Sequence, residues 1–573
     1  MPQRRWSLAS PDAGAVEVLC REAGLRPQTA AVLLNRGVDG AEAAKRFLEP
    51  RLADLTPPDR LPDTGAAADR LARAVTAGER IALFGDYDVD GITSTVLLLE
   101  LLRDLGAEVS YEIPDRAAGY GLSTDAVERA VADGAKLLVT VDCGTSAREA
   151  VAAAGRAGLD VIVTDHHQIT DALPEAAAVV NPQRDDGSGA GRELAGVGVA
   201  MHLAMALRAR LRELGFFGER VEPNLKAVLD LVALGTIADV VPLTGENRIL
   251  VAVGLQVLGR TRRPGLSALL EVSGVRDPAS ITARDVAFRL APRLNAAGRM
   301  GDPSRGVELL AARDKNRARA MAADLDEENR RRRQEQDRLI AEAGRLLGEA
   351  PEERMALVVT GDGWPRGLVG LVAGRLADRH RRPAVVFSCE GGRCVGSARS
   401  VPPLNLHDAL GDCGGLMLEW GGHAEAAGMT LESSRVDEFG EALERAVAAR
   451  VSKEELREEL HLDATLSPGE LDEALIDELT RLAPHGAANP APLFLVRDVV
   501  VKEAWTMGRD GATLGLRLGL ADGREVRCVG FGQGHRRPPD GSHLDLAARP
   551  VRNEFRGERR LELIVEDLRE AGA

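Results

Sequence analysis

Three aspartates stand at alternate positions in the stretch LFGDYDVDGITS, directly after a short apolar run. They are Asp86, Asp88 and Asp90, and an apolar segment resumes a few residues beyond them. Carboxylates this close repel one another unless a cation, hydrogen bonds or protonation relieves the repulsion. The residue types and their spacing therefore favour a cation-binding loop at the end of a buried strand.

Three further clusters of the same chemistry follow along the chain. Asp142 lies in VTVDCG, Asp165, His166 and His167 lie in VTDHH, and Asp239 lies in GTIADVVPL. Carboxylates and imidazoles without thiolates suit Mn²⁺ or Mg²⁺ better than structural zinc. Two such ions about 3.5–4 Å apart can hold both the attacking and the leaving oxygen of a phosphoryl transfer. We expect the four clusters to form one shared metal site.

Each cluster taken alone has a plainer interpretation. An aspartate at the end of a strand is often the N-cap of the next helix, and a histidine pair there is often structural. The DxDxDG pattern also resembles a calcium loop, but it lacks the glutamate at the twelfth position and follows a strand instead of a helix. Four clusters at successive strand ends favour a shared site over separate structural roles.

The elements that must position these residues alternate between short apolar runs and helical patterns. RIALFG, AEVSYEIPD, KLLVTVDCG and DVIVTDHH predict strands, and STVLLLELLRDLG and SAREAVAAAGRAG predict helices. This alternation predicts a parallel sheet with helices on both faces. The clusters follow the strands, at the carboxyl edge where open α/β sheets bind ligands.

Beyond this sheet the sequence predicts a long helix, a second α/β unit and a β-barrel. More than thirty residues from Ala312 onward contain neither Gly nor Pro and are rich in helix formers. On that helix Arg330 to Arg333 are expected on a solvated face, with a DNA-facing role as the alternative. Residues 353–450 again contain strands, such as MALVVTG and PAVVFSC, and end in EWGGHAEAAGM. From about residue 460, short alternating strands with ADG and RG turns predict an all-β barrel.

Composition limits the class of protein without naming a partner. The length of 573 residues suits three or four domains, and 45% apolar with 28% charged residues is typical of a globular chain. No apolar run is long enough for a membrane span, and the N-terminal MPQRRWSLASPDAG lacks the apolar core of a secretory signal. The six scattered cysteines form no CxxC pair, which argues against a zinc ribbon or a disulfide framework and favours a reducing cytoplasm. The net charge of −15 neither supports nor excludes nucleic acid, because it does not report a local groove.

The ordered motifs DYDVDG, VDCG, TDHH and GTIADVVPL resemble those of the DHH phosphoesterase superfamily, which is named for such a triplet. The segments PDRAAGYGL, RLNAAGRMG and GGHAEAAGM narrow the resemblance to the RecJ family of single-strand-specific 5′→3′ exonucleases. The resemblance runs from about residue 75 almost to the C-terminus. It implies two-metal, in-line hydrolysis of a phosphodiester with release of nucleoside 5′-monophosphates.

The resemblance also implies a division of the chain. The α/β fold would comprise a DHH-type parallel-sheet lobe, a long joining helix, a smaller DHHA1-type α/β lobe and a C-terminal OB-fold. The expected parts are a helical extension at 1–75, the DHH domain at 76–305, the linking helix at 306–350, the DHHA1-type domain at 351–455 and the OB-fold at 460–573.

Five residues of the clusters would be the ligands of two Mn²⁺ or Mg²⁺ ions by this resemblance: Asp86, Asp88, Asp142, His166 and Asp239. Asp142 would bridge the ions, and the first two aspartates would belong to separate ions. Asp90 and Asp165 would support the ligands, and His167 would contact the scissile phosphate or the leaving oxygen. Many DHH enzymes have a histidine where Ala82 stands, so one ion is expected to have fewer protein ligands.

Substrate contacts are implied in three motifs and in the segment GSARS, namely at Arg116, Tyr120, Arg293, Asn295, Arg299, Ser397, Arg399, Gly421, Gly422 and His423. Arg116 and Arg399 offer forked donors for a terminal phosphate, and Ser397 adds a hydroxyl. The alternative for Arg116 is an ion pair between lobes, and for His423 a purely structural role. The glycines would let the backbone approach a strand closely.

The OB-fold would hold single strands on a positive groove with aromatic faces. Candidate phosphate contacts are Arg549, Arg552, Arg556, Arg559 and Arg560; candidate stacking residues, each with a core role as the alternative, are Phe494, Trp505, Phe531 and Phe555. RecJ proteins commonly have phenylalanine where His485 stands and glycine where Ala488 stands, so local details of this domain can differ.

The function that these residues predict is a single-strand-specific DNA exonuclease in repair and recombination. The alternatives are an oligoribonuclease or cyclic-dinucleotide phosphodiesterase of the same superfamily, and an inactive scaffold that binds single strands. The extra C-terminal barrel favours long strands, and the retained ligands argue against a dead enzyme. Single-stranded DNA is the expected partner, with a single-strand-binding protein or a helicase as further candidates; no membrane is expected, and the chain is expected to be a cytoplasmic monomer.

Overall fold

The computed structural model describes residues 4–115, 119, 121–169, 172–186, 189–519, 523–555 and 558–572. The side chains of Met300, Pro468, Glu554, Phe555, Glu558 and Arg559 lie outside this description. The chain forms two compact units, which are described separately. One comprises Met1–Arg5, Arg299–Gly301 and Leu325–Leu460, and the other comprises Trp6–Gly298, Asp302–Asp324 and His461–Ala573.

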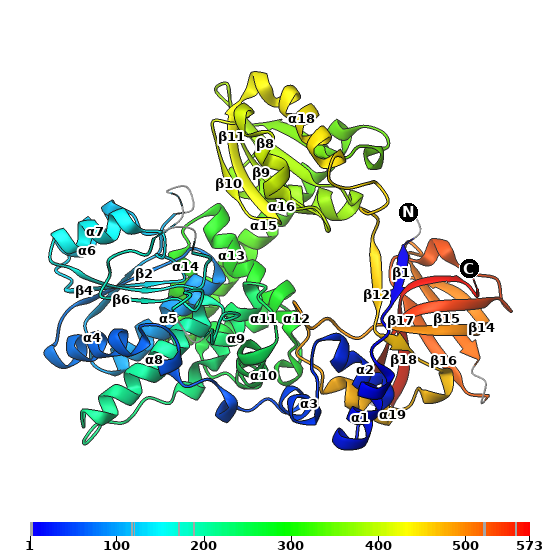
Figure 1. Cartoon of the computed structure of the whole chain (residues 1–573), viewed down its shortest axis with the longest axis horizontal. Coiled ribbons are helices and arrows are strands. Elements are labelled where there is room, and N and C mark those ends of the chain that lie inside the picture. The colour runs from blue at the N-terminus through cyan, green and yellow to red at the C-terminus, as the bar shows by residue number, and fades with distance from the viewer. Residues whose placement is uncertain are drawn as a thin grey trace. The chain divides into compact units, whose positions relative to one another are not determined.

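The larger unit contains a five-stranded parallel sheet in the order β3-β2-β4-β5-β6. Its strands are β2 (Ile81–Gly85), β3 (Val109–Glu112), β4 (Leu137–Val141), β5 (Asp160–Thr164) and β6 (Ala178–Val180). The four strands that the sequence predicts are confirmed, and β6 is an additional one. Figure 1 shows α6 (Thr124–Ala132) and α7 (Arg148–Arg156) along one face, and α4 (Thr64–Ala77) and α8 (Gly196–Glu213) along the other.

The alternation of apolar residues along these strands divides them between the two faces. Ala82 and Phe84 of β2 join a core with Val127 of α6 and Val151 of α7. Their neighbours along the strand, such as Leu83, are equally buried, at 1% exposure, so the sheet is covered on both sides. Ala82 is thus an apolar core residue, and no metal donor replaces the histidine of other DHH enzymes at this position.

Further helices include one that lies between β2 and β3 in the chain and several that come after β6. They are α5 (Val89–Asp104), α9 (Leu229–Ala238), α10 (Gly245–Leu258), α11 (Pro264–Val272), α12 (Ala283–Asp285), α13 (Ala291–Met300), α14 (Ser304–Leu310) and α15 (Lys315–Leu347). A π-helical turn at Val286–Leu290 precedes α13. The long helix that the sequence predicts is therefore confirmed as α15, with 33 residues.

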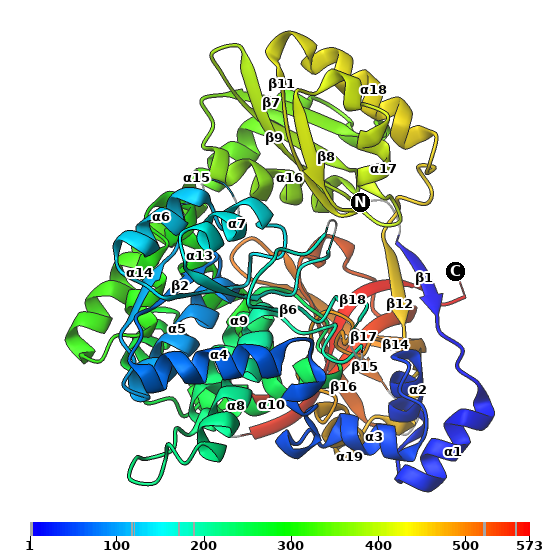
Figure 2. The ribbon, with the colours of Figure 1, turned by 60° about the vertical axis from the view of Figure 1, so that its left-hand side comes forward.

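The smaller unit contains a five-stranded mixed sheet in the order β10-β11-β9-β8-β7. The strands are β7 (Leu357–Asp362), β8 (Ala384–Glu390), β9 (Arg393–Arg399), β10 (Glu419–Gly422) and β11 (Ala426–Glu432). The helices α16 (Arg366–His380), α17 (Leu406–Gly411) and α18 (Val436–Ala448) share one apolar core with this sheet (Figure 2).

The C-terminal part of the larger unit is the predicted β-barrel. Its strands are β13 (Ala464–Thr465), β14 (Phe494–Met507), β15 (Thr513–Gly519), β16 (Glu525–Gly530), β17 (His543–Phe555) and β18 (Glu558–Glu570). They run in the order β14-β15-β16-β18-β17, and β17 pairs back with β14 to close the barrel. The helix α19 (Glu473–Thr480) precedes β14. Phe494 is fully buried, which makes it a core residue and excludes it as a stacking residue.

The N-terminal segment belongs to the fold of this barrel. Its helices are α1 (Ala13–Ala23), α2 (Pro27–Asn35) and α3 (Ala41–Leu48), and β1 (Arg5–Leu8) pairs with β12 (Glu459–Leu462). Leu33 of α2 and Phe47 of α3 join the same hydrophobic core as Leu516 and Leu546 of the barrel. The sequence indicates helices here but gives no sign of this shared core.

Arg248 in α10 forms hydrogen bonds that connect the barrel region to the helices of the larger unit. Its guanidinium donates hydrogen bonds to the carbonyl oxygens of Phe47, Arg481, Leu482 and Ala483, at 2.7–3.0 Å. The side chain is buried and lies over the Phe47 ring. Burial lowers the pKa of Arg248 to about 10, so the group is still charged at neutral pH. The four carbonyls compensate this buried charge.

Replacing Arg248 by Met is expected to lower the free energy of unfolding by about 3 kcal/mol, because it leaves buried carbonyls without donors. Thermal unfolding followed by circular dichroism measures this change as a lower melting temperature. Arg262→Met removes an exposed arginine of the same region and is expected to change stability by at most about 0.5 kcal/mol. Equal melting temperatures for the two variants would contradict this role of Arg248.

Two expectations from the sequence are wrong. Arg332 is only 8% exposed and hydrogen-bonds Asn329 and Gln336, so the run Arg330 to Arg333 is not solvated throughout. The reason is helical spacing, since position 332 lies seven residues from both Leu325 and Leu339 on the buried stripe of α15.

The sequence argued against a disulfide framework, but one disulfide joins Cys389 to Cys394. The two cysteines are cross-strand partners in the β8–β9 hairpin. Their spacing in the sequence does not indicate that pairing. The four remaining cysteines are free thiols.

Among the described helices, none is both long and apolar enough to cross a membrane.

Candidate metal centre and substrate surface

All four sequence clusters meet at the carboxyl edge of the parallel sheet. Asp86 follows β2, Asp142 follows β4, and the triplet Asp165, His166 and His167 follows β5. Asp239 comes from the end of α9 instead of a strand. Parallel strands bring their carboxyl ends to one edge, so residues far apart in the chain become neighbours.

The donor atoms form three overlapping groups, each with its atoms within 4.8 Å of one another. The groups are Asp86–Asp88–Asp142, Asp142–His166–His167 and Asp90–His166–Asp239. Asp142 belongs to two of them, which is the position that a bridging carboxylate would need. Asp86 and Asp88 fall in the same group, so their assignment to separate ions stays a proposal.

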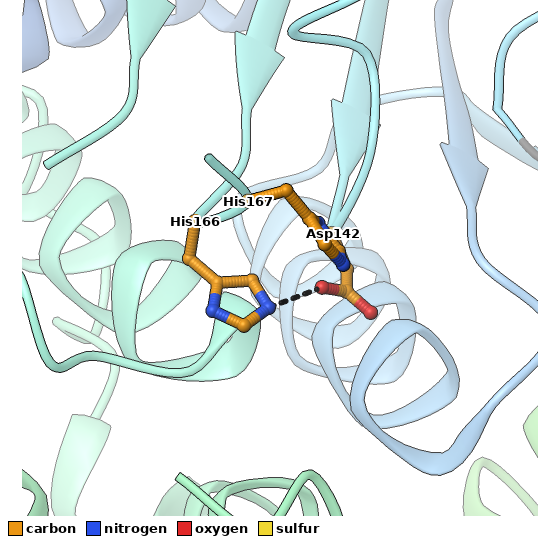
Figure 3. Close-up of side chains that lie close together, drawn as sticks. All are labelled: Asp142, His166 and His167. Carbon is orange, nitrogen blue, oxygen red and sulfur yellow. Dashed lines mark ion pairs between the residues drawn. The ribbon is translucent and has the colours of Figure 1, made fainter. Parts of the chain in front are cut away.

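His166 faces the carboxylates with an unprotonated nitrogen. Its Nε2 lies 3.2 Å from Oδ1 of Asp142 and 3.6 Å from Oδ2 of Asp239 (Figure 3 shows the first pair). Burial and the charge of His167 lower the pKa of His166 to about 4, so the ring is neutral at pH 7. Nε2 makes no hydrogen bond among the described residues, whereas the ring interacts with the Leu194 backbone. A ring with its N–H on Nδ1 would leave the lone pair of Nε2 facing carboxylate oxygens.

A cation bound between these groups would remove the repulsion between them. A neutral imidazole lone pair and carboxylate oxygens at such distances repel one another, and Oδ2 of Asp239 is likewise buried without a hydrogen-bond partner among the described residues. A histidine that donates one N–H to a carbonyl and points the other nitrogen at carboxylates has the arrangement of a metal ligand. The donor set of carboxylates with one neutral imidazole fits Mn²⁺ or Mg²⁺.

Burial and mutual repulsion raise the pKa values of three carboxyl groups in the centre. Burial, together with the charges of neighbouring aspartates, raises the pKa of Asp142 well above its ordinary value. Burial, with the charges of Asp239 and Asp88, does the same for the pKa of Asp90. Burial and the charge of Asp88 raise the pKa of Asp239 to about 7. Protons therefore compete with a cation for this site.

This competition predicts a pH-dependent metal requirement. Below about pH 7 Asp239 holds a proton that an incoming ion must displace, whereas above it the carboxylate is already free. In the unfolded chain this carboxyl has a pKa near 3.9, so the ion-free protein also loses stability as the pH rises through about 7. We expect the Mn²⁺ concentration for half-maximal activity to fall from pH 6 to pH 8, and Mn²⁺ to raise the melting temperature more at pH 8. Titrations of both quantities that do not change with pH would contradict the assignment.

Asp88 and Asp90 also hold local backbone structure. Oδ1 of Asp88 accepts hydrogen bonds from the amides of Asp90 and Gly91 and so caps α5. The two oxygens of Asp90 accept from the amides of Gly196 and Val197 at the start of α8, at 2.6 and 2.8 Å. The N-cap interpretation and the metal interpretation are thus compatible, because a carboxylate has two oxygens.

Asp165 organises the loop around His167. Its oxygens accept from the amides of Thr145, His166 and His167, and Oδ1 lies 2.7 Å from Nδ1 of His167. Burial opposes a charge on each partner, but the hydrogen bond between them outweighs it, so the pKa of Asp165 falls and that of His167 rises. The His167 side chain is 44% exposed, against 12% for His166, so the His167 imidazole lies at the surface of the centre.

Strained backbone occurs beside two of the acidic groups. Asp142 has φ +62°, a left-handed conformation that aspartate tolerates better than most residues. Val240, directly after Asp239, has φ +62° and is 71% exposed, which is unusual for a β-branched residue. Such strain concentrates at functional sites.

Two residues near the centre, Asn181 and Gly196, were not predicted from the sequence. Buried Asn181, directly after β6, donates to the Thr145 hydroxyl and to the His167 carbonyl. Gly196 lies so close to Asp142 that a Cβ there would stand 2.6 Å from its Oδ1. The only available signal for Asn181 is its position after a strand, like the other clusters.

The predicted substrate residues fall into three sets. Arg116 and Tyr120 lie outside the described residues. On α13, Arg293 donates to the carbonyls of Arg289 and Val272, Asn295 is half-buried, and Arg299 donates to the Gly367 carbonyl at 3.1 Å. The third set lies in the smaller unit.

In that unit, one row of the sheet brings small residues into register. Ser397 of β9 pairs with Gly428 of β11, and Gly428 pairs with Gly421 of β10. A Cβ at either glycine would meet no atom within 4 Å, so the surface over the two glycines is open, whereas Gly370 of α16 lies close to the Ser397 hydroxyl. Arg399 donates to the Ser397 hydroxyl at 2.9 Å. Gly422 closes β10, and His423 is exposed just beyond it.

In the barrel, the candidate arginines differ in their surroundings. Arg549 forms an ion pair with Glu566, and Arg552 forms ion pairs with Glu473 and Asp477. Arg560 lines a pocket on the outer face of the barrel. Arg556 and the side chains of Phe555 and Arg559 lie outside the described residues, while Phe531 is 69% exposed. Ala488 has φ +55°, a conformation that explains why glycine suits this position.

Comparison with known proteins matches three parts of the chain to family models. Residues 80–236 match the DHH family N-terminal domain, residues 353–449 the DHHA1 domain and residues 462–567 the RecJ OB domain. A curated relative from Dickeya dadantii, named single-stranded-DNA-specific exonuclease RecJ, is 42% identical over 521 residues, covering 88% of this chain and 89% of the relative.

Solved structures agree with these matches. The crystal structure of RecJ from Thermus thermophilus in complex with Mn²⁺ has a TM-score of 0.85 and 32% identity, and the match covers 100% of this chain and 81% of that chain. The Mg²⁺ complex of the same protein has a TM-score of 0.79 and 31% identity, with coverage of 99% and 79%.

Proposed function

The chain belongs to the RecJ family of single-stranded-DNA-specific exonucleases, and we propose that it hydrolyses single-stranded DNA stepwise from the 5′ end, releasing nucleoside 5′-monophosphates. Its fold combines the DHH, DHHA1 and OB domains of that family. A role in DNA repair and recombination is consistent with the family. The observation that carries the proposal is the buried cluster in which Asp142 belongs to two donor groups at one sheet edge.

Two Mn²⁺ or Mg²⁺ ions are the cofactors of this reaction, and the residues that would hold them are Asp86, Asp88, Asp142, His166 and Asp239. When bound, such ions lower the pKa of a water and neutralise charge on the phosphate. Asp86 and Asp142 are buried, and Asp88 accepts two backbone hydrogen bonds, so the chain would hold these carboxylates in place before substrate binds.

Other residues of the centre act on the substrate or its surroundings. His167, whose pKa is raised by its hydrogen bond to Asp165, would donate a hydrogen bond to the scissile phosphate or to the leaving oxygen. Asp90 would hold the start of α8 against the centre, and Asp165 would fix the loop that carries Thr145. The hydrogen bonds of Asp90 and Asp165 support their roles, and the role of His167 rests on the motif resemblance.

For the substrate strand we propose contacts at Gly421 and Gly428, because the open surface over these glycines admits a sugar–phosphate backbone, and at the neighbouring Ser397. The Arg399 guanidinium beside Ser397 would bind a phosphate. Arg116, Tyr120, Arg293, Asn295, Arg299, Gly422 and His423 remain proposed contacts on the strength of the motif resemblance. The same holds for the domain boundaries.

The test of the function uses oligonucleotides labelled at one end. Purified protein with Mn²⁺ is expected to release labelled mononucleotide at once from 5′-labelled single-stranded DNA, and to shorten 3′-labelled DNA stepwise. Double-stranded DNA with blunt ends is expected to resist. Cleavage restricted to oligonucleotides of two to five residues would favour the oligoribonuclease alternative, and binding without cleavage would favour a scaffold.

We further propose that the chain works in the cytoplasm as a monomer, with a single-strand-binding protein or a helicase delivering the strand. The proposed partners are supported by the single-stranded DNA for which its relatives are named. Sedimentation of the purified protein at micromolar concentration tests the monomer: a single species of about 61 kDa is expected from the mass of 61.0 kDa, and a stable dimer would contradict it.

A further inference from the structure

One oxygen of Asp239 lacks the backbone support that other carboxylates of the metal centre have. Asp88 and Asp90 each accept hydrogen bonds from two backbone amides. Oδ2 of Asp239, which lies 3.6 Å from Nε2 of His166, is buried without a hydrogen-bond partner among the described residues. That oxygen is therefore placed by the backbone that carries Asp239, and not by a hydrogen bond.

The backbone after Asp239 is strained and anchored at its far end. Asp239 ends α9 and begins a segment of the chain, residues 239–243, which we call the ligand loop. Val240 in this loop has φ +62°, and a strained conformation of this kind persists only where the surrounding structure enforces it. One anchor is the buried Asn247 of α10, whose Nδ2 donates a hydrogen bond to the Pro242 carbonyl at 3.0 Å.

The second anchor of the ligand loop comes from a distant part of the chain. The Leu243 amide donates a hydrogen bond to the Ala487 carbonyl at 2.9 Å. The Leu243 side chain is buried, and a Cβ at Gly486 would stand 2.7 Å from its Cδ1. Leu243 thus fills space that glycine leaves free at position 486. The two segments therefore contact each other through both backbone and side chain.

The segment that provides this anchor, residues 484–489, precedes β14 and is called the entry loop below. Its own hydrogen bonds hold it in place. Gly486 and Asn489 exchange two backbone hydrogen bonds, at 3.0 and 3.1 Å. Nδ2 of the buried Asn489 donates to the carbonyls of Leu482 and Pro484, and Arg248 also donates to the Leu482 carbonyl. The entry loop is thus a well-supported surface against which the ligand loop is anchored.

We propose that the entry loop positions Asp239 in the metal centre, with Gly486 and Leu243 as the positioning residues. Neither residue is a metal ligand or a substrate contact; their contact fixes the ligand loop and, through it, the carboxylate. The inference deepens the proposed function, on which it rests for the role of Asp239 as a ligand. It gives the C-terminal region a part in assembling the metal centre that is separate from contact with the substrate strand.

The first test is Gly486→Ala, which brings a methyl group into the space that Leu243 occupies. Because groups that support metal ligands typically change affinity or activity by about 10- to 100-fold, this variant is expected to bind Mn²⁺ about tenfold more weakly or worse. Isothermal titration calorimetry of the full-length protein without DNA measures this affinity. In hydrolysis, a lower kcat with an unchanged KM for the single strand is expected, since the substrate contacts are intact.

Leu243→Ala removes the same contact without adding an atom, and it is also expected to weaken Mn²⁺ binding. In the double variant Gly486→Ala, Leu243→Ala, the two Cβ atoms would lie 4.0 Å apart, an ordinary van der Waals distance. The double variant is therefore expected to bind Mn²⁺ more tightly than Gly486→Ala alone. The matched control is Gly469→Ala, where a Cβ would meet nothing within 4 Å, and it is expected to equal the wild type. Melting temperatures without metal verify that the variants are folded.

A double-mutant cycle with Asp239→Asn separates an action through this ligand from a general disturbance. In the Asp239→Asn background, Gly486→Ala is expected to cause no further loss of Mn²⁺ affinity, because two changes that act through one group are not additive. Losses that add in free energy would overturn the proposal. Wild-type Mn²⁺ affinity in both Gly486→Ala and Leu243→Ala would overturn it as well.

Calorimetry and hydrolysis report separately on this inference and on the proposed function. If the wild type binds Mn²⁺ but releases no nucleotide, the exonuclease is refuted, while weaker Mn²⁺ binding in Gly486→Ala would still support the positioning role. If the wild type releases nucleotide and both single variants bind Mn²⁺ as it does, the exonuclease stands and the positioning role is refuted.

Discussion

Replacing Asp142 by Asn is expected to lower the rate of single-strand hydrolysis by about a thousandfold or more. Asp142 is the residue common to the Asp86–Asp88 group and the His166–His167 group, so its loss affects both. Metal ions contribute several kcal/mol of transition-state stabilisation, and each 1.36 kcal/mol is tenfold in rate. Asparagine is the right replacement, because it also tolerates the left-handed backbone that Asp142 adopts at φ +62°.

The measurement is the initial rate of nucleotide release from labelled single-stranded DNA with saturating Mn²⁺. The stabilisation by Mn²⁺, read as the rise in melting temperature, is expected to shrink in the same variant because a charged ligand is lost. Asp104→Asn changes an exposed aspartate at the end of α5 and serves as the control with wild-type rate and wild-type response to Mn²⁺. Activity within tenfold of the wild type in Asp142→Asn would contradict its central position.

Replacing Gly196 by Ala is expected to lower the same rate by about a hundredfold without any change of a polar group. The new Cβ would stand 2.6 Å from Oδ1 and 2.8 Å from Cβ of Asp142, distances that force the aspartate or the start of α8 to move. The amide of Gly196 also donates to Asp90 at 2.6 Å, so movement of the helix disturbs a second carboxylate. Misplacement of a reacting group by about 1 Å can cost a hundredfold.

Gly65→Ala is the matched control for this substitution. Gly65 lies in the first turn of α4, as Gly196 does in α8, but a Cβ there would meet nothing within 4 Å. Its rate and melting temperature are expected to equal or exceed those of the wild type, because alanine favours the helix. Equal activity of Gly196→Ala and Gly65→Ala would contradict the requirement for close contact between Asp142 and the start of α8.

The parallel sheet and the meeting of three of the four clusters at its edge were predictable for one physical reason. A parallel sheet needs buried strands with helices between them, which leaves a readable alternation of apolar runs. Residues that directly follow such strands must meet at one edge, so Asp86, Asp142 and His166 could be placed together before any coordinates. The barrel followed in the same way from short strands and turn residues.

What the sequence does not reveal depends on contacts between distant segments. Gly196 is required by the proximity of Asp142, and Asn181 by the loop of His167; neither has a local pattern that indicates it. The pairing of Cys389 with Cys394 depends on hairpin register, and the burial of Arg332 on the face that α15 turns inward.

The shared core of the N-terminal helices and the barrel has the same origin. Leu33 and Phe47 are apolar residues of short helices, which predict burial but not the surface that buries them. Leu516 and Leu546 are nearly five hundred positions away from them along the chain, and no periodic pattern links segments so distant. Only the closed tertiary structure shows that the two ends of the chain share one core.

A two-ion centre in which Asp142 is shared can be observed in crystals of the protein grown with Mn²⁺ and measured at the manganese absorption edge. Two anomalous peaks are expected at the carboxyl edge of the parallel sheet, with Asp142 on both, Asp86 or Asp88 on one and His166 on the other. A single peak, or two peaks without Asp142 between them, would contradict it.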